Sequence, residues 1–243
     1  MNKKYTYVWV SLIVLVFGII VVPRIVERLS SGSVVENDRL NASGKKIDAK
    51  LGYVLLDGER RKVPPFEFIN QDSVLVSDKD YLGKVYVVDF FFTRCPSICP
   101  VMTTNLVDVQ DHFKDANDFA VASFSITPDF DTPQVLRAYV EKYGINGANW
   151  NLMTGDHEGI YQLANSGFNI FAAEMPDVPG GFEHSGLFAL VDKDGYLRSR
   201  IDDFGNAIVY YRGAILEEKG VNDHGEIEEI GILKVDIQKL LEE

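Results

Sequence analysis

The chain has 243 residues, of which 46% are hydrophobic and 25% are charged, and its formal net charge is -12. This length predicts one domain with additional segments, and the hydrophobic content is high enough for a buried core, which excludes a disordered chain. A nucleic-acid binder needs a basic face that neutralises phosphates, so the negative charge argues against nucleic acid as a partner.

The first 24 residues predict a membrane anchor. No charged residue occurs in the 18 positions from Tyr5 to Val22, which as a helix would span about 27 Å, close to the thickness of a bilayer core. A cleaved signal peptide is the alternative, but its apolar region is usually shorter and no typical cleavage site follows directly. We expect an uncleaved transmembrane helix over 1–24 with the globular part outside.

Residues 25–50 are polar and rich in Ser, Asn and Gly, which is typical of a flexible stalk. The compact domain is therefore expected over residues 51–243. Short strands and a turn are expected over 62–84, ahead of the first long apolar segment.

Two continuous apolar runs, residues 85–93 and 119–127, predict strands buried on both faces. Hydrophobic residues at helical spacing predict a helix over 99–113 between them. A second helix is expected to begin after Thr132, with Pro133 in its first turn, and to end at Gly144.

The remaining elements complete an alternating pattern. They are a strand over 149–155, a helix over 156–170, a hairpin over 186–201 closed by Asp194 and Gly195, an edge strand over 207–215 and a final helix over 230–243. This order predicts an α/β fold with a central mixed sheet flanked by helices. A strand that leads into two cysteines at a helix start is a thioredoxin-like arrangement.

Cys95 and Cys99 are the two cysteines of the chain, and they lie four positions apart at this helix start. The positive end of a helix favours a thiolate, which is both a nucleophile and a metal ligand. Side chains four apart on a helix have Cβ atoms about 5–6 Å from each other, which suits a metal and also permits a disulfide after adjustment. A functional pair is favoured over inert thiols or a purely structural disulfide.

Two sulfurs leave a metal under-coordinated, and His184 is the predicted third ligand. It lies in a glycine-rich loop directly before a buried strand, and in thioredoxin-like folds this loop faces the cysteine turn. Two thiolates and one imidazole form a soft site, which selects Cu(I) or zinc. Of the other histidines, His112 is expected at the surface, His157 beside a helix cap and His224 in a loop.

Three segments, residues 90–106, 125–144 and 181–198, resemble the Sco/SenC family of membrane-anchored copper chaperones, which serve cytochrome c oxidase assembly. The resemblance covers about residues 60–205. It implies that Cys95, Cys99 and His184 bind one copper ion, Cu(I) or Cu(II), and that the domain delivers it to the binuclear copper centre of an oxidase subunit. The family is also credited with reducing the cysteines of that subunit.

Two residues of these segments need a role. Asp131 matches an acidic loop of the family, so it is expected either near the site or as a charge at the start of the helix after Thr132. Arg94 departs from the family pattern, and a cation beside the thiols would lower their pKa further.

Met175 is expected to pack under its loop rather than to bind copper, although its thioether is a soft ligand.

The resulting hypothesis is a copper chaperone in a bacterial inner membrane, with its soluble domain in the periplasm and a copper-accepting oxidase subunit as partner. An anchored thiol–disulfide oxidoreductase or peroxidase is the alternative, with Cys95 as nucleophile and Cys99 as resolving thiol. Such an activity would act on partner proteins, and whether the chain is an enzyme stays open at this point. A redox or copper sensor is a third hypothesis.

Overall fold

The computed structural model describes residues 15, 17, 50–145, 149–175, 177, 180–201 and 206–243. Apart from Leu15, Phe17 and Lys50, the predicted anchor (1–24) and stalk (25–50) lie outside these residues. Within the described part of the chain, no helix combines the length and hydrophobicity needed to cross a membrane. The chain divides into two units, Met1–Gly44 and Lys45–Glu243, and the fold described below is that of the second.

A seven-stranded sheet forms the centre of this unit, in the order β14-β11-β6-β7-β8-β4-β5. Strands β6, β7 and β8 are parallel, and the other pairs are antiparallel, so the predicted mixed sheet is confirmed. The strand bounds are β4 Glu67–Asn70, β5 Leu75–Ser77, β6 Val85–Phe91, β7 Phe119–Ser125, β8 Trp150–Thr154, β11 Leu187–Val191 and β14 Tyr210–Arg212.

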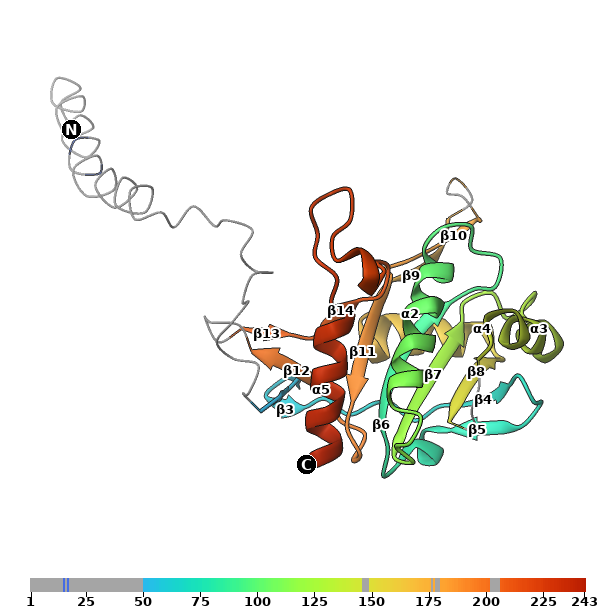
Figure 1. Cartoon of the computed structure of the whole chain (residues 1–243), viewed down its shortest axis with the longest axis horizontal. Coiled ribbons are helices and arrows are strands. Elements are labelled where there is room, and N and C mark those ends of the chain that lie inside the picture. The colour runs from blue at the N-terminus through green and yellow to red at the C-terminus, as the bar shows by residue number, and fades with distance from the viewer. Residues whose placement is uncertain are drawn as a thin grey trace, which may run out of the picture. The chain divides into compact units, whose positions relative to one another are not determined.

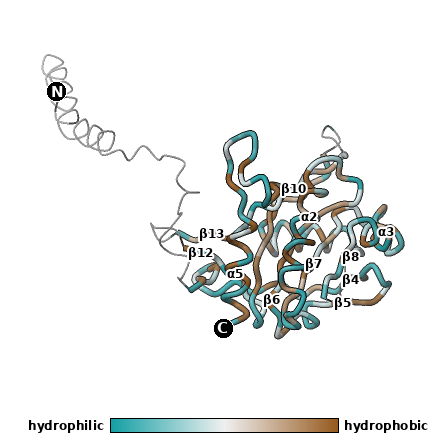
Figure 2. Tube along the Cα trace, viewed as in Figure 1, coloured by the Kyte–Doolittle hydropathy of each residue, from teal (hydrophilic) through white to brown (hydrophobic). Residues whose placement is uncertain are grey.

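The two predicted apolar strands occupy the middle of the sheet, and every residue of β6 and β7 is buried. They pair in parallel from Val85 opposite Phe119 to Phe91 opposite Ser125. Helices cover both faces, which is why neither strand shows the alternation of a half-exposed strand. Figure 2 shows hydrophobic residues along the inner elements and hydrophilic ones in the outer loops.

Four α-helices of the described residues flank the sheet: α2 Ile98–His112, α3 Pro133–Tyr143, α4 His157–Gln162 and α5 Ile230–Glu242. Two neighbouring residues of β6, Phe90 and Phe91, show which segments cover each face of the sheet, because successive side chains of a strand point to opposite faces. The Phe91 ring lies 5.5 Å from that of Tyr139 in α3, and the Phe90 ring lies 5.9 Å from that of Phe168. Figure 1 shows α2 and α5 in front of the sheet and α4 behind it.

The predicted ends of α3 are confirmed. The Thr132 hydroxyl accepts a hydrogen bond from the Val135 N–H, Pro133 follows in the first turn, and Gly144 ends the helix with φ 64°. The helix predicted over 156–170 is split, because α4 continues as a π-helix over Leu163–Phe168. Asn169 then ends it in the left-handed region, at φ 54°.

The helix predicted over 99–113 is confirmed as α2, and its start shows that only the second cysteine of the pair is helical. Ser97 is its N-cap and Ile98 its first residue, so Cys95 and Pro96 belong to the preceding turn. Cys99 lies in the first helical turn. Pro100 is tolerated beside it, because the N–H groups of a first helical turn have no acceptor within the helix.

Smaller elements surround the central sheet. The predicted hairpin over 186–201 forms as a single bridge between Val191 and Leu197, after which the chain leaves the central sheet. The predicted edge strand over 207–215 is confirmed for β14, which lies beside β11 at the edge of the sheet. The remaining bounds are β1 Gly52–Tyr53, β2 Leu55–Leu56, β3 Glu59–Arg60, β9 Ala172–Glu174, β10 Phe182–His184, β12 Arg198–Ile201, β13 Ala207–Ile208, and the 3₁₀ helices η1 Asp78–Tyr81 and η3 Glu217–Lys219.

Candidate metal centre

The cysteine turn follows the carboxyl end of β6, between this strand and the start of α2. The neighbours of β6 are β7 on one side and β11 on the other, so the direction of strand order reverses here. Ligand sites of open α/β sheets occur at such reversal points. A hydrogen bond from the Cys95 N–H to the Phe92 carbonyl (3.2 Å) closes the turn.

His184 approaches this turn from a different part of the sequence. It is the last residue of β10, which pairs with β9 so that His184 lies opposite Ala172. The expected glycine-rich loop is therefore a short two-stranded hairpin at this position. The centroid of the Phe92 ring lies 5.6 Å from that of Phe182 and 5.9 Å from that of His184. These contacts pack the hairpin against the segment that leads into the cysteine turn.

The three predicted ligands meet in one cluster. The ligand atoms of Cys95, Cys99 and His184 lie within 4.8 Å of one another. Cys99 Sγ is 3.0 Å from His184 Nε2, and the Cys99 N–H donates to Cys95 Sγ at 3.5 Å. Both thiols are free and all three side chains are buried. Two sulfurs and one imidazole nitrogen at this separation fit one soft metal ion such as copper, whereas a hard, oxygen-seeking cation would find no carboxylate in the cluster.

The two thiols differ sharply in acidity. A hydrogen bond from the Cys99 thiol is the main cause that lowers the pKa of Cys95, and His184 and the backbone N–H groups of Cys99 and Ser97 add to it. Burial is the main cause that raises the pKa of Cys99, followed by its hydrogen bond to Cys95. In the metal-free protein one thiolate therefore forms, at Cys95, and Cys99 keeps its proton.

Asp89 lies near the cluster and was not predicted from the sequence as a residue of the site. It lies in the middle of β6, is 3% exposed, and accepts a hydrogen bond from the Ser123 hydroxyl at 2.5 Å. Burial raises its pKa to about 7, and its charge is among the causes that raise the pKa of Cys99. A carboxyl group inside the apolar run of residues 85–93 was the available signal.

Asp131 is fully buried and connects the cysteine turn with the segment after β7. It accepts hydrogen bonds from the backbone N–H and the hydroxyl of Thr93, and from the hydroxyls of Ser125 and Thr127, at 2.5 to 3.0 Å. Its role is thus to fix the backbone two residues before Cys95. At the start of α3 the cap is Thr132, and the first turn of this helix holds no acidic residue.

Arg94 does not act as predicted. Its guanidinium group lies over the Phe130 ring, 3.6 Å from the ring centroid. The groups that lower the pKa of Cys95 are hydrogen-bond donors, and Arg94 is not among them. The expectation that this cation lowers the thiol pKa values is therefore wrong.

The structure does not bring the other histidines to the site. His112 and His224 are exposed, and His157 pairs with Glu174 at 3.1 Å. Met175 is 36% exposed, so it does not pack under its loop as expected.

Comparison with known proteins identifies the family. Residues 56–213 match the family model described as SCO1/SenC. The chain belongs to the SCO1/SenC family. This match includes Cys95, Cys99 and His184, and it extends slightly beyond the segment, about residues 60–205, in which the resemblance was found.

Individual relatives agree with this assignment. The SCO1 protein homolog of Bacillus subtilis (strain 168) is 34% identical over 146 residues, which are 59% of this chain and 75% of the relative. BsSco, described as having a disulfide switch and as a member of the Sco family of cytochrome c oxidase assembly proteins, is 28% identical with a TM-score of 0.59, over 77% of this chain and 97% of BsSco. ScoI of Bradyrhizobium japonicum, solved with copper bound, is 26% identical with a TM-score of 0.51, over 58% of this chain and 89% of ScoI. The predicted thioredoxin-like fold is confirmed for the described domain.

The unequal acidity of the thiols predicts a two-step titration of the copper-free, reduced protein. Thiolate absorbance at 240 nm should rise once well below the ordinary range of cysteine and again well above it, because a thiolate exists above its pKa and the two pKa values move apart. In Cys99→Ala the main donor to Cys95 is lost, so the lower step should move up by roughly one pH unit or more. Cys95→Ala should lack the lower step. Two steps near the ordinary value would contradict the arrangement.

The role of Asp131 predicts a stability effect that its neighbour lacks. Asp131→Asn should lower the free energy of unfolding by roughly 2 kcal/mol, because an amide cannot accept all the hydrogen bonds that converge on the buried carboxylate. Asp129→Asn, at an exposed position two residues earlier, is the control and should leave stability unchanged. Urea unfolding monitored by circular dichroism measures both, and equal midpoints for the two variants would show that Asp131 does not hold the turn.

Proposed function

We propose that this protein is a copper chaperone that binds one copper ion through Cys95, Cys99 and His184 and delivers it to the binuclear copper centre of a cytochrome c oxidase subunit. The observation that carries the proposal is the cluster of two thiols and one imidazole within 4.8 Å. Membership of the SCO1/SenC family supports it, as does the copper bound to ScoI of Bradyrhizobium japonicum.

The residues of the site have complementary tasks in holding copper as a cargo. Cys95 supplies a thiolate before the ion arrives, since its pKa is lowered. Cys99 gives up its proton when the ion binds, because the cation offsets the burial that otherwise raises its pKa. His184 binds through Nε2, the nitrogen that faces Cys99 Sγ. Thiolates favour Cu(I), while the imidazole also suits Cu(II), so we propose that the site accepts both oxidation states.

The proposed location is a bacterial inner membrane, with the domain over residues 51–243 in the periplasm. The uncharged run from Tyr5 to Val22 supports a single-pass anchor over residues 1–24, and the polar composition of residues 25–50 supports a stalk. Such a tether would confine the domain to the membrane surface where an oxidase is assembled.

A thiol–disulfide reaction is the second candidate, favoured by the different exposure and acidity of the two cysteines. Cys95 is 8% exposed and Cys99 is fully buried, which suits an attacking thiolate and a resolving thiol. Cys95 would attack the disulfide of a partner protein, and Cys99 would release the mixed disulfide. The chain's thiols would lose two electrons and two protons, which the partner gains as two thiols. The disulfide switch described for BsSco supports this chemistry.

The copper-binding proposal requires His184, whereas the thiol–disulfide reaction does not, so His184→Ala distinguishes them. Changes to the partners of metal ligands alone lower affinity roughly 10- to 100-fold, so loss of a ligand should weaken Cu(I) binding by about 100-fold or more. The Cys95–Cys99 disulfide should still form on oxidation, because the imidazole takes no part in it. Competition with a chromophoric Cu(I) chelator, under anaerobic conditions, measures affinity and stoichiometry.

Two control variants complete this test. His157→Ala removes an imidazole that lies outside the cluster, and Met175→Leu removes an exposed thioether, so both should keep wild-type affinity. If His184→Ala also keeps wild-type affinity and one copper per chain, the three-ligand site is wrong and the thiol–disulfide candidate gains.

A further inference from the structure

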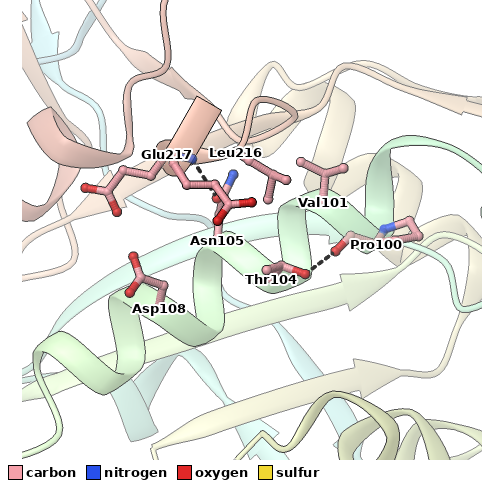
Figure 3. Close-up of a pocket in the computed structure, with 8 residues that line it drawn as sticks. Pro100, Val101, Thr104, Asn105, Asp108, Leu216 and Glu217 are labelled. Carbon is pink, nitrogen blue, oxygen red and sulfur yellow. Dashed lines mark hydrogen bonds between the residues drawn. The ribbon is translucent and has the colours of Figure 1, made fainter. Parts of the chain in front are cut away.

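A groove of about 600 Å³ lies beside the cysteine turn. Figure 3 shows its two walls, which are the first turns of α2 and the segment that follows β14. The groove begins at Pro100, the residue directly after Cys99. Its lining residues are Pro100, Val101, Thr104, Asn105, Asp108, Leu216, Glu217 and Glu218.

Asn105 holds the two walls together. Its side chain is 3% exposed, and its Nδ2 donates to the carbonyls of Gly213 (2.9 Å) and Ile215 (2.8 Å). Its Oδ1 accepts from the Glu217 N–H at 3.4 Å. All the polar atoms of a buried carboxamide thus serve to fix the second wall on α2. The groove is preformed, so an occupant would not have to order it on binding.

The charges of the groove are negative and only partly compensated. Lys234 Nζ lies 2.5 Å from both Asp108 Oδ2 and Glu217 Oε2, while Glu218 is exposed. Two of the three carboxylates of the groove therefore share one ammonium group, and the third, that of Glu218, lies at the exposed rim. Pro100, Val101 and Leu216 supply apolar surface between them. The complementary occupant presents an apolar side chain flanked by basic groups.

The two walls differ in their relation to the family. The α2 wall lies inside the segment that matches SCO1/SenC, which ends at residue 213. The residues of the second wall lie beyond it, from Leu216 to Glu218, as does Lys234. The groove thus joins the part of the chain that carries the cysteines to a part outside the family match, which suits the selection of a particular partner.

We propose that this groove docks a basic, apolar surface segment of the copper-accepting protein and so aligns the acceptor's metal site with Cys95, Cys99 and His184. This inference rests on the proposed function. Two observations carry it: the groove begins at Pro100, the residue directly after Cys99, and its carboxylates are complementary to a basic partner. The net charge of -12 would steer such a partner toward the domain, and the groove would fix its orientation.

Charge reversal at Glu218 tests the docking surface. The probe is the copper-free, reduced copper-accepting domain of the oxidase subunit from the same organism. In Glu218→Lys, copper transfer at low ionic strength should slow roughly threefold or more, because a rim charge acts mainly on the rate of association. Glu141→Lys is the matched control, since it makes the same charge change at an exposed position of α3. The difference between the two variants should shrink as salt is added.

A second pair of variants tests the apolar part. Leu216→Ser should speed dissociation of the acceptor complex at any salt concentration, whereas Val235→Ser, at an exposed position of α5, should not. Cu(I) affinity without acceptor should equal the wild-type value in all four variants. That measurement separates the two proposals: absence of copper binding by the wild-type protein would refute the proposed function itself.

The groove proposal has its own contrary outcomes. If the wild-type protein binds copper and transfers it, but Glu218→Lys and Leu216→Ser behave like their controls, the groove is not the docking surface. If the wild-type protein binds copper but forms no complex with the acceptor domain, the groove proposal is overturned as well.

Discussion

The 3.0 Å contact between Cys99 Sγ and His184 Nε2 is the interaction on which the site depends. It joins the first turn of α2 to the hairpin of β9 and β10, two segments that lie 85 residues apart in the chain. The Phe92 ring supports this contact by packing against the imidazole, and Asp131 fixes the backbone of the next residue, Thr93. These two contacts hold the three side chains of the cluster in place.

The electrostatics of the site explain why a cation suits it. Burial raises the pKa of the Asp89 carboxyl group and is the main cause that raises the pKa of the Cys99 thiol, to which the negative charges of Cys95 and Asp89 add. The metal-free protein therefore stores one negative charge at Cys95 and leaves Cys99 protonated. A soft cation bound by both sulfurs, as proposed, would reverse this balance, since it would make the second deprotonation favourable. The same asymmetry also suits disulfide exchange.

Much of the fold could be predicted because the local sequence signals for strands and helix ends match the structure that tertiary packing requires. The runs that became β6 and β7 are apolar except at Asp89, Ser123 and Ser125, and a run of this kind fits a strand buried on both faces. Thr132, Pro133 and Gly144 mark the ends of α3 by local chemistry: a capping hydroxyl, a fixed φ and a left-handed backbone. The place of Cys95 relative to α2 was not decided by the sequence, because Pro96 fits either a first helical position or the turn before one; in the structure both residues lie in the turn.

The candidate site residues and the family could be recognised from the chain alone, since two cysteines four positions apart and a histidine before a strand are readable without coordinates. The surroundings of these residues became known only from the folded structure. Three contacts join residues far apart in the chain: the Thr93 hydroxyl donates to Asp131, Arg94 stacks on Phe130 instead of facing a thiol, and Asn105 bonds the backbone of Gly213 and Ile215. Local sequence cannot specify such contacts. A polar side chain pairs with whichever group lies next to it in the folded protein, and this neighbour depends on how distant segments of the chain pack together.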